Sequence, residues 1–341
     1  MKLKNRIYGL AAPAKTVLVA GSLALLLAAC GGGDKGDNLN TGAKQTMSPS
    51  KETSQPLKPD ELPKALLDGK YKGMYARFSQ PLKNEVSEAD LKEIGDEFTK
   101  GIQTLEKSSS MQLNGFDRRL WLSEDGKKGL LGVFDPEGVI MSIQVQPLTI
   151  WPETDKKLSK QQYAWPLPGE WFVFWGGENV LVNYHYEHEA QRYSYDLIQV
   201  KEGFSYRGDP LKNESYYAFG KNIIAPGDGT IVSVVNDIKD NEPVGVMNPN
   251  QPAGNNVVID HGGGEFSHLA HFKKGSATVK PGDKVKKGDV IGLVGNSGNS
   301  SEAHLHVQLS DGADLFNSRS INIKWKDGLK PLQGDTITIA E

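Results

Sequence analysis

Two histidines lie one residue apart near the C-terminal end of the chain, in the stretch GNSGNSSEAHLHVQLS (295–310). Side chains on a strand alternate between faces, so His304 and His306 should share one face while Leu305 points to the other. Two imidazoles in one small volume suit a metal site, or one ligand beside an acid–base group. Surface strands also carry such pairs by chance, so this pair needs support from elsewhere in the chain.

That support comes from where the other histidines lie. A random scatter would not leave the first half of the chain empty, yet all seven lie in the second half, at positions 185, 188, 261, 268, 271, 304 and 306. This concentration favours a shared site.

A catalytic zinc site needs three nitrogen or oxygen ligands and one open position. His185 ends one apolar run, and Asp196 lies within the next, flanked by Tyr195 and Leu197. A carboxylate in such a setting needs a partner. The partner could be a metal, or it could be Arg192 or a lysine in an ordinary salt bridge.

His268 and His271 are alternative candidates for a further histidine of the site. His268 and His271 are separated by an odd number of residues, so on a continuous strand they would face opposite sides and only one could face the site. His261 lies in the turn DHGGG and is expected to be a hydrogen-bonded loop histidine.

The order of motifs resembles a known family. N-x-H, a carboxylate after QRYSY, APGDGTIV, GNNVVIDHG and the run from LAHF to AHLHVQL follow one another between about 165 and 330. They resemble the lysostaphin/LytM-type zinc metallopeptidases, which hydrolyse peptide bonds in bacterial peptidoglycan. The resemblance implies a mainly β domain with an antiparallel sheet, a barrel-sandwich or duplicated-hybrid-like peptidase fold, a zinc cofactor and a peptidoglycan peptide as substrate.

Carried over by position, the resemblance implies that His185, Asp196 and His306 bind zinc. It implies that His304 and His271 are catalytic residues outside the metal, one accepting a proton from water and the other stabilising the oxyanion.

The first histidine precedes its aspartate by eleven residues, whereas the common family pattern has four. This spacing leaves His188 as a rival of His185, and His268 remains a rival of His271.

Three other interpretations explain the sequence less well. A non-catalytic relative would bind cell wall or regulate a partner hydrolase, but such relatives usually lack a metal residue, and here every required type is present. Lipoyl and biotinyl carriers share the glycine-rich pattern but need a lysine at a Met-Lys-Met-like hairpin tip. Iron oxygenases usually have the first histidine almost next to the carboxylate.

The whole chain has 341 residues, 38% apolar and 24% charged, with a net charge of −3. These values describe a soluble globular protein long enough for two domains, and they give no indication of a nucleic-acid partner.

The N-terminus is different, because Lys2, Lys4 and Arg6 precede the apolar run TVLVAGSLALLLAAC, which predicts a signal peptide over 1–29. The run ends at Cys30, the single cysteine, in a pattern that resembles the bacterial lipobox. The resemblance implies an exported lipoprotein with its lipid on Cys30. It would be anchored at the outer face of the cell membrane, or in the outer membrane of a two-membrane cell.

Residues 30–58 are too poor in large apolar residues to fold and predict a flexible tether. Helical periodicity after Ser87 and strand patterns beyond it predict a small α+β domain over 59–150, loosely similar to the nuclear-transport-factor-2-like class. A linker over 151–164 would then lead to the β-rich metallopeptidase domain over 165–341.

Overall fold

The computed structural model describes residues 57–339. The predicted signal peptide, Cys30 and almost all of the predicted tether lie outside the described residues. Within 57–339, every helix is too short or too polar to cross a bilayer.

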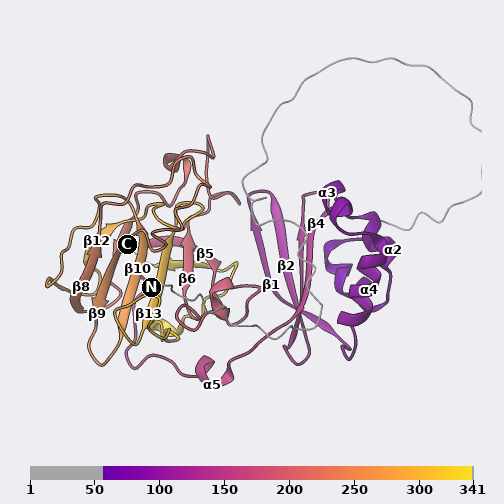
Figure 1. Ribbon diagram of the computed structural model, residues 1–341, viewed down its shortest axis with the longest axis horizontal. Helices are drawn as coiled ribbons and strands as arrows, with labels where there is room; N and C mark the ends of the chain where they lie inside the picture. The colour runs from indigo at the N-terminus through magenta and orange to yellow at the C-terminus, as the bar shows by residue number, and fades with distance from the viewer. Residues whose placement is uncertain (1–56, 340–341) are drawn as a thin grey trace, which may run out of the picture.

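The first part of the described chain is a group of short helices followed by an antiparallel sheet in the order β1-β2-β3-β4. Figure 1 shows the helices, in indigo, against one side of this sheet. The elements are a 3-10 turn Pro59–Glu61, α1 Leu62–Leu67, α2 Tyr71–Ala76, α3 Gln80–Glu85, α4 Glu88–Phe98, β1 Leu105–Leu113, β2 Phe116–Ser123, β3 Lys128–Phe134 and β4 Ile140–Pro147.

Helix α4 begins where the sequence predicts. The Ser87 hydroxyl accepts a hydrogen bond from the Asp90 backbone N–H, and the Asp90 carboxylate accepts one from the Ser87 N–H. This reciprocal capping satisfies donors that the first helical turn leaves without partners. The buried side chains Leu91 and Phe98 then pack with Trp121 of β2 in one hydrophobic cluster.

The other face of the β1–β4 sheet packs on the C-terminal part of the chain. Leu120 and Leu131 share a buried cluster with Leu181 and Val182. A second cluster joins Met111 and Leu113 of β1 to Phe172 and Ile198. The sheet is therefore covered on both faces, by its own helices and by the domain that follows.

The C-terminal part is built on an eight-stranded sheet in the order β11-β8-β9-β10-β13-β6-β5-β14, with a separate pair β12-β7. The paired strands run antiparallel, which confirms the predicted mainly β, antiparallel domain, whereas the barrel-sandwich assignment stays a prediction. The strands are β5 Gly169–Trp175, β6 Tyr195–Ile198, β7 Asn222–Ile224, β8 Gly229–Val235, β9 Asn255–Asp260, β10 Phe266–Phe272, β11 Lys284–Val285, β12 Val290–Leu293, β13 Leu305–Ser310 and β14 Thr336–Ile339.

The segment between the two sheets lies along the C-terminal domain. Helix α5, Pro152–Asp155, ends at a carboxylate that accepts hydrogen bonds from the hydroxyls of Tyr186 and Tyr193. Farther on, the buried Glu265 carboxylate accepts from the Tyr163 hydroxyl at 2.9 Å. These contacts fasten the segment at both of its ends.

The loop before β13 requires glycine for steric reasons. Gly298 has a φ of +85°, and a Cβ at this position would overlap the backbone nitrogen of Gly254. Gly254 precedes β9, so this close approach joins the loop that leads to His304 to the neighbouring strand.

Gly298→Ala should lower the free energy of unfolding by about 3 kcal/mol, because strain at positive φ adds to a backbone clash. Gly288→Ala is the matched control, since Gly288 has a φ of +93° but open space around its Cα. The control should cost only about 1 kcal/mol. Urea unfolding of the two variants measures the difference, and equal losses would mean that the contact with Gly254 is unimportant.

Candidate metal centre

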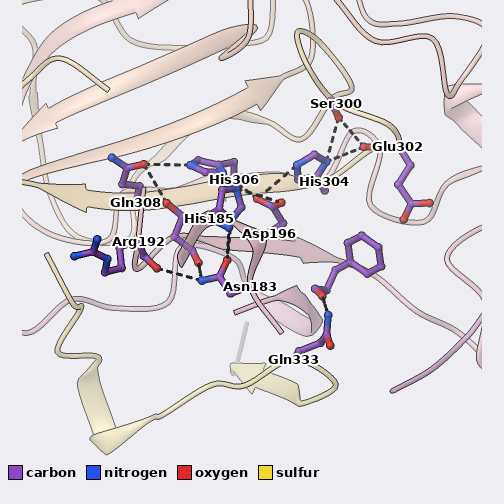
Figure 2. Close-up of polar contacts among 12 residues, drawn as sticks. Asn183, His185, Arg192, Asp196, Ser300, Glu302, His304, His306, Gln308 and Gln333 are labelled. Atoms are coloured by element: carbon purple, nitrogen blue, oxygen red, sulfur yellow. Dashed lines mark hydrogen bonds and ion pairs between the residues drawn. The ribbon is translucent and has the colours of Figure 1, made fainter. Parts of the chain in front are cut away.

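Three side chains from two separate parts of the chain meet in the middle of the large sheet. His185, Asp196 and His306 are buried, and one ligand atom from each lies within 4.8 Å of the others. Figure 2 shows the three side chains close together. We call them the His–Asp–His group.

The strand register places two members opposite each other. Asp196 of β6 and His306 of β13 are cross-strand partners. Cross-strand partners project to the same face, so the His306 Nδ1 lies 2.9 Å from the Asp196 Oδ1. Arg192, the alternative partner of Asp196, instead donates from Nε to the Tyr186 carbonyl and stacks on the Trp151 ring.

His185 lies on a short 3-10 helix, Tyr184–Glu187, rather than on a strand. The Asn183 side-chain oxygen accepts from the His185 Nδ1–H at 2.9 Å, which leaves Nε2 free, 3.7 Å from the Asp196 Oδ2. Asn183 is itself held by donating to the carbonyls of Arg192 and Ser194. The rival His188 is exposed and outside the group.

A glutamine orients the His306 ring. The Gln308 side-chain oxygen faces the His306 Nε2 at 3.4 Å, and the Ser194 hydroxyl donates to the same oxygen at 3.0 Å. The Gln308 amide donates to the Ala190 carbonyl. This fixes the amide orientation, so the Gln308 oxygen is turned toward Nε2 and the His306 Nδ1 faces Asp196.

His304 shares this face, as strand alternation predicts for H-x-H. Its Nδ1–H donates to the Glu302 carbonyl at 2.8 Å, with the Ser300 hydroxyl 3.1 Å away. Its Nε2 lies 3.7 Å from the Asp196 Oδ1. His304 therefore presents an unbonded ring nitrogen to the edge of the His–Asp–His group.

His271 reaches the site through a break in β10. The pairing of β10 with β9 shifts register between Ala270 and Phe272, and His271 has a φ of +64°. The ring of His271 lies with its centroid 4.6 Å from that of His304, and its Nδ1–H donates to the Ser297 carbonyl at 2.7 Å. The premise of a continuous strand was therefore wrong, because a β-bulge redirects this side chain.

The other two histidines of the region bind backbone groups. His268 donates from Nε2 to the Gly312 carbonyl, and its buried Nδ1 has no hydrogen-bond partner within residues 57–339. His261 bonds the Asp228 carbonyl and the Ser267 hydroxyl, which confirms the expected hydrogen-bonded loop histidine.

Burial determines the protonation of the site. It lowers the pKa of His185 to about 3 and holds the pKa of His271 well below its ordinary value. Burial alone would raise the pKa of Asp196, but the neighbouring His185 and His304 and the hydrogen bond to His306 outweigh this effect and hold the pKa well below the usual range. Neutral imidazoles and an ionised carboxylate are the forms that bind a divalent metal ion.

Sequence reasoning missed the residues that orient these rings, Asn183, Ser300 and Gln308. Asn183 and Gln308 each lie two residues from a histidine of the group, and Ser300 lies in the loop before His304. A polar residue two positions along a strand shares a face with its neighbour, so Gln308 could have been found by the same alternation that pairs His304 with His306.

Comparison with known families gives a match over part of the C-terminal domain. Residues 215–322 match the family described as peptidase family M23. The match includes His271, His304 and His306 but begins after His185 and Asp196, so two members of the His–Asp–His group lie outside it.

Similar proteins are found in several bacteria. The peptidoglycan DD-endopeptidase ShyA of Vibrio cholerae is 36% identical over 105 residues, which cover 30% of this chain and 21% of that protein. An uncharacterized metalloprotease of Buchnera aphidicola is 32% identical over 105 residues, covering 31% of this chain and 24% of the relative. The chain thus spans less than a quarter of the length of these two relatives.

Among solved structures, the catalytic domain of lysostaphin from Staphylococcus simulans is 19% identical to this chain. The match covers 50% of this chain and 92% of that domain, with a TM-score of 0.25.

His185→Ala should weaken Zn²⁺ binding by at least about 100-fold, because even the loss of a residue that only orients a ligand costs 10- to 100-fold. His188→Ala is the matched control and should bind as the wild type does. Calorimetric titration of the metal-free protein with Zn²⁺ measures both. The opposite pattern would make His188 the ligand.

The buried His268 predicts a pH dependence of stability. Burial lowers the pKa of folded His268 to about 4, from an ordinary value of 6.5. As the pH falls from 6.5 toward 4, the unfolded chain gains a proton that the folded chain does not, so stability is lost on acidification. This one group contributes roughly 1.4 kcal/mol per pH unit within that window.

His268→Gln removes this contribution and should give a shallower fall of the unfolding free energy between pH 6.5 and 4. Urea unfolding across this range compares the two proteins. Parallel curves would show that His268 takes up its proton equally in both states.

Proposed function

We propose that this chain is a zinc-dependent endopeptidase that hydrolyses a peptide bond in bacterial peptidoglycan, because residues 215–322 match peptidase family M23. The bond would lie in a stem peptide or a cross-bridge. One observation carries the proposal: two histidines with unbonded Nε2 atoms lie beside a buried group of two imidazoles and a carboxylate.

The donor set fits zinc. It offers two nitrogens and one oxygen, and each imidazole has its other ring nitrogen bonded to a side-chain amide oxygen. Zinc in catalytic sites takes three such ligands and keeps one position open. We assign His185, Asp196 and His306 as those ligands. When bound, the metal would supply a Lewis acid that polarises the scissile carbonyl and lowers the pKa of water.

His304 is suited to move a proton. Its Nδ1–H is used by the Glu302 carbonyl, so the neutral ring carries its lone pair on Nε2, beside Asp196. Nε2 can accept a proton from the attacking water and later deliver it to the leaving amine, a role worth typically 10²- to 10⁴-fold in rate.

His271 has the same tautomer, because its Nδ1–H donates to the Ser297 carbonyl. A neutral His271 therefore presents a lone pair at Nε2 and can stabilise an oxyanion only after it takes up a proton. The two rings lie 4.6 Å apart between centroids, so protonation of one opposes protonation of the other. We infer that the pair shares one catalytic proton.

The substrate and place of action complete the proposal. ShyA, the similar protein of Vibrio cholerae, is a peptidoglycan DD-endopeptidase by name. The basic and apolar N-terminus ending at Cys30 supports an exported lipoprotein, with residues 30–58 as a tether from the membrane. A lipid anchor would hold the enzyme beside its insoluble substrate.

The proposal is tested by incubating purified peptidoglycan with the full chain, with and without a zinc chelator, and analysing the released fragments by mass spectrometry. A new amine terminus that disappears with chelator would establish the reaction and identify the bond. No new terminus, from a preparation shown to hold zinc, would favour a non-catalytic protein that binds cell wall or regulates a partner hydrolase.

Alanine variants should separate the two histidines of the H-x-H pair. His306→Ala and Asp196→Ala should lose both bound zinc and peptidase activity, since each removes a ligand. His304→Ala should keep zinc and lose activity at least about 100-fold, because it removes only the proton acceptor. Metal analysis and fragment release measure the two properties, and loss of zinc from His304→Ala would exchange the two roles.

A further inference from the structure

The tip of the β1–β2 hairpin of the N-terminal domain is hydrogen-bonded to the C-terminal domain. Asn114 has a φ of +51° and precedes Gly115, so the two residues form the turn of the hairpin. The Asn114 backbone N–H donates to the Gly203 carbonyl at 2.8 Å, and its side-chain oxygen accepts from the Ser205 N–H at 2.9 Å. The side-chain amide also donates to the Ser205 hydroxyl at 3.2 Å.

Ser205 continues the contact toward the candidate site. Its side chain is buried, and the hydroxyl donates to the Glu302 Oε2 at 3.3 Å. Glu302 is also buried, at 8% exposure, and its Oε1 has no hydrogen-bond partner within the described chain. Ser205 is the one side chain in that part of the chain shown donating to this carboxyl group.

Glu302 meets His304 through its backbone. The Glu302 carbonyl accepts from the His304 Nδ1–H at 2.8 Å and from the Ser300 hydroxyl at 2.8 Å. Figure 2 shows the Glu302 carboxyl pointing away from the histidines while its carbonyl faces them. The side chain thus anchors the residue on one side, and the backbone orients the His304 ring on the other.

A buried carboxyl with one unpaired oxygen is costly, so its placement requires a reason. Burial raises the pKa of Glu302 to about 7, which shows that the surroundings provide little compensation for a charge. The hydrogen bond that the carboxyl accepts from the Ser205 hydroxyl is the partner that the described residues provide for it.

We propose that the N-terminal domain positions the catalytic His304 through the contacts Asn114–Ser205–Glu302. The inference rests on the proposed function, because it assigns Asn114, Ser205 and Glu302 as positioning residues for that reaction. The N-terminal domain is then a part of the active enzyme, and a partner that pulls the hairpin away would lower activity without touching the metal.

Apolar packing between the two domains is a second observation that links the β1–β2 hairpin to the candidate site. Met111 and Leu113, at the end of β1 that leads into the hairpin, pack with Ile198 of β6. Asp196 lies two residues before Ile198 on the same strand. Residues two apart on a strand project to the same face, so the strand that leads into the hairpin packs on the face of β6 that carries the Asp196 carboxylate.

Asn114→Gly tests the proposal in the full chain. Glycine tolerates the positive φ of the turn, so this variant removes the side-chain hydrogen bonds and keeps the hairpin. On a soluble cross-linked muropeptide, kcat should fall by roughly 10-fold with KM and bound zinc unchanged. Asn84→Gly is the matched control, because Asn84 is exposed and its side chain bonds only Gln80 in its own helix.

A spectroscopic measurement separates this inference from the proposed function. Labelling histidine Cε1 with ¹³C gives seven signals in the full chain, and His304→Gln identifies that of His304. In zinc-loaded protein, Asn114→Gly should shift or broaden the His304 signal while Asn84→Gly leaves it unchanged. If the wild type has no peptidase activity, the proposed function fails, and this signal alone still decides the coupling.

Two Glu302 variants complete the test. Glu302→Gln keeps an acceptor for Ser205 and should retain the wild-type His304 signal and kcat, whereas Glu302→Ala should resemble Asn114→Gly. The double variant Asn114→Gly/Glu302→Ala should be no worse than Glu302→Ala, since both act through one set of contacts. The proposal would be overturned if the loss of kcat in the double variant equalled the product of the two single losses. It would also be overturned if Asn114→Gly left the His304 signal unchanged.

Discussion

A carboxylate in the middle of a β-sheet is the constraint on which the rest of this site depends. Asp196 is about 4% exposed and lies on β6, between β13 and β5. A buried charge requires polar partners or a counter-ion. The imidazoles of the neighbouring strand β13 and of a 3-10 helix lie against this carboxylate. The residues that stabilise the buried charge are therefore the same residues that could bind a metal ion.

Each histidine of the site is then held by a partner outside the centre. Asn183 and Gln308 offer side-chain oxygens, while Ser297 and Glu302 offer backbone carbonyls. In each case one ring nitrogen forms a hydrogen bond directed outward, and the other ring nitrogen faces the centre. The inward nitrogen can bind a metal ion or accept a proton only when the ring is neutral. Burial lowers the pKa of His185 and His271 and so preserves the lone pairs of these two rings, while the outward hydrogen bonds fix their tautomers.

Much of this could be predicted from residue types and spacing, and the failures have identifiable physical causes. The H-x-H alternation and the unusual setting of Asp196 follow from the period of a strand, and α4 follows from its capping residues. The bulge at His271 could not be foreseen, because a positive φ at a non-glycine residue depends on tertiary contacts. The contact of Asn114 with Ser205 was equally hidden, since it joins positions 91 residues apart.

The order of strands in the sheet differs from their order along the chain. Strand β14 pairs with β5 at the sheet edge, although it follows every other strand in sequence. Asp196 likewise cannot contact His306 until a further 110 residues have been synthesised. During synthesis the helices and the β1–β4 meander can fold as soon as they emerge. Strands β5 and β6 can pair with each other, but their outer edges stay open until β13 and β14 have been made. The apolar outer face of the early sheet, with Met111 and Leu113, offers Phe172 and Ile198 a surface to pack on before the later strands of the large sheet are made.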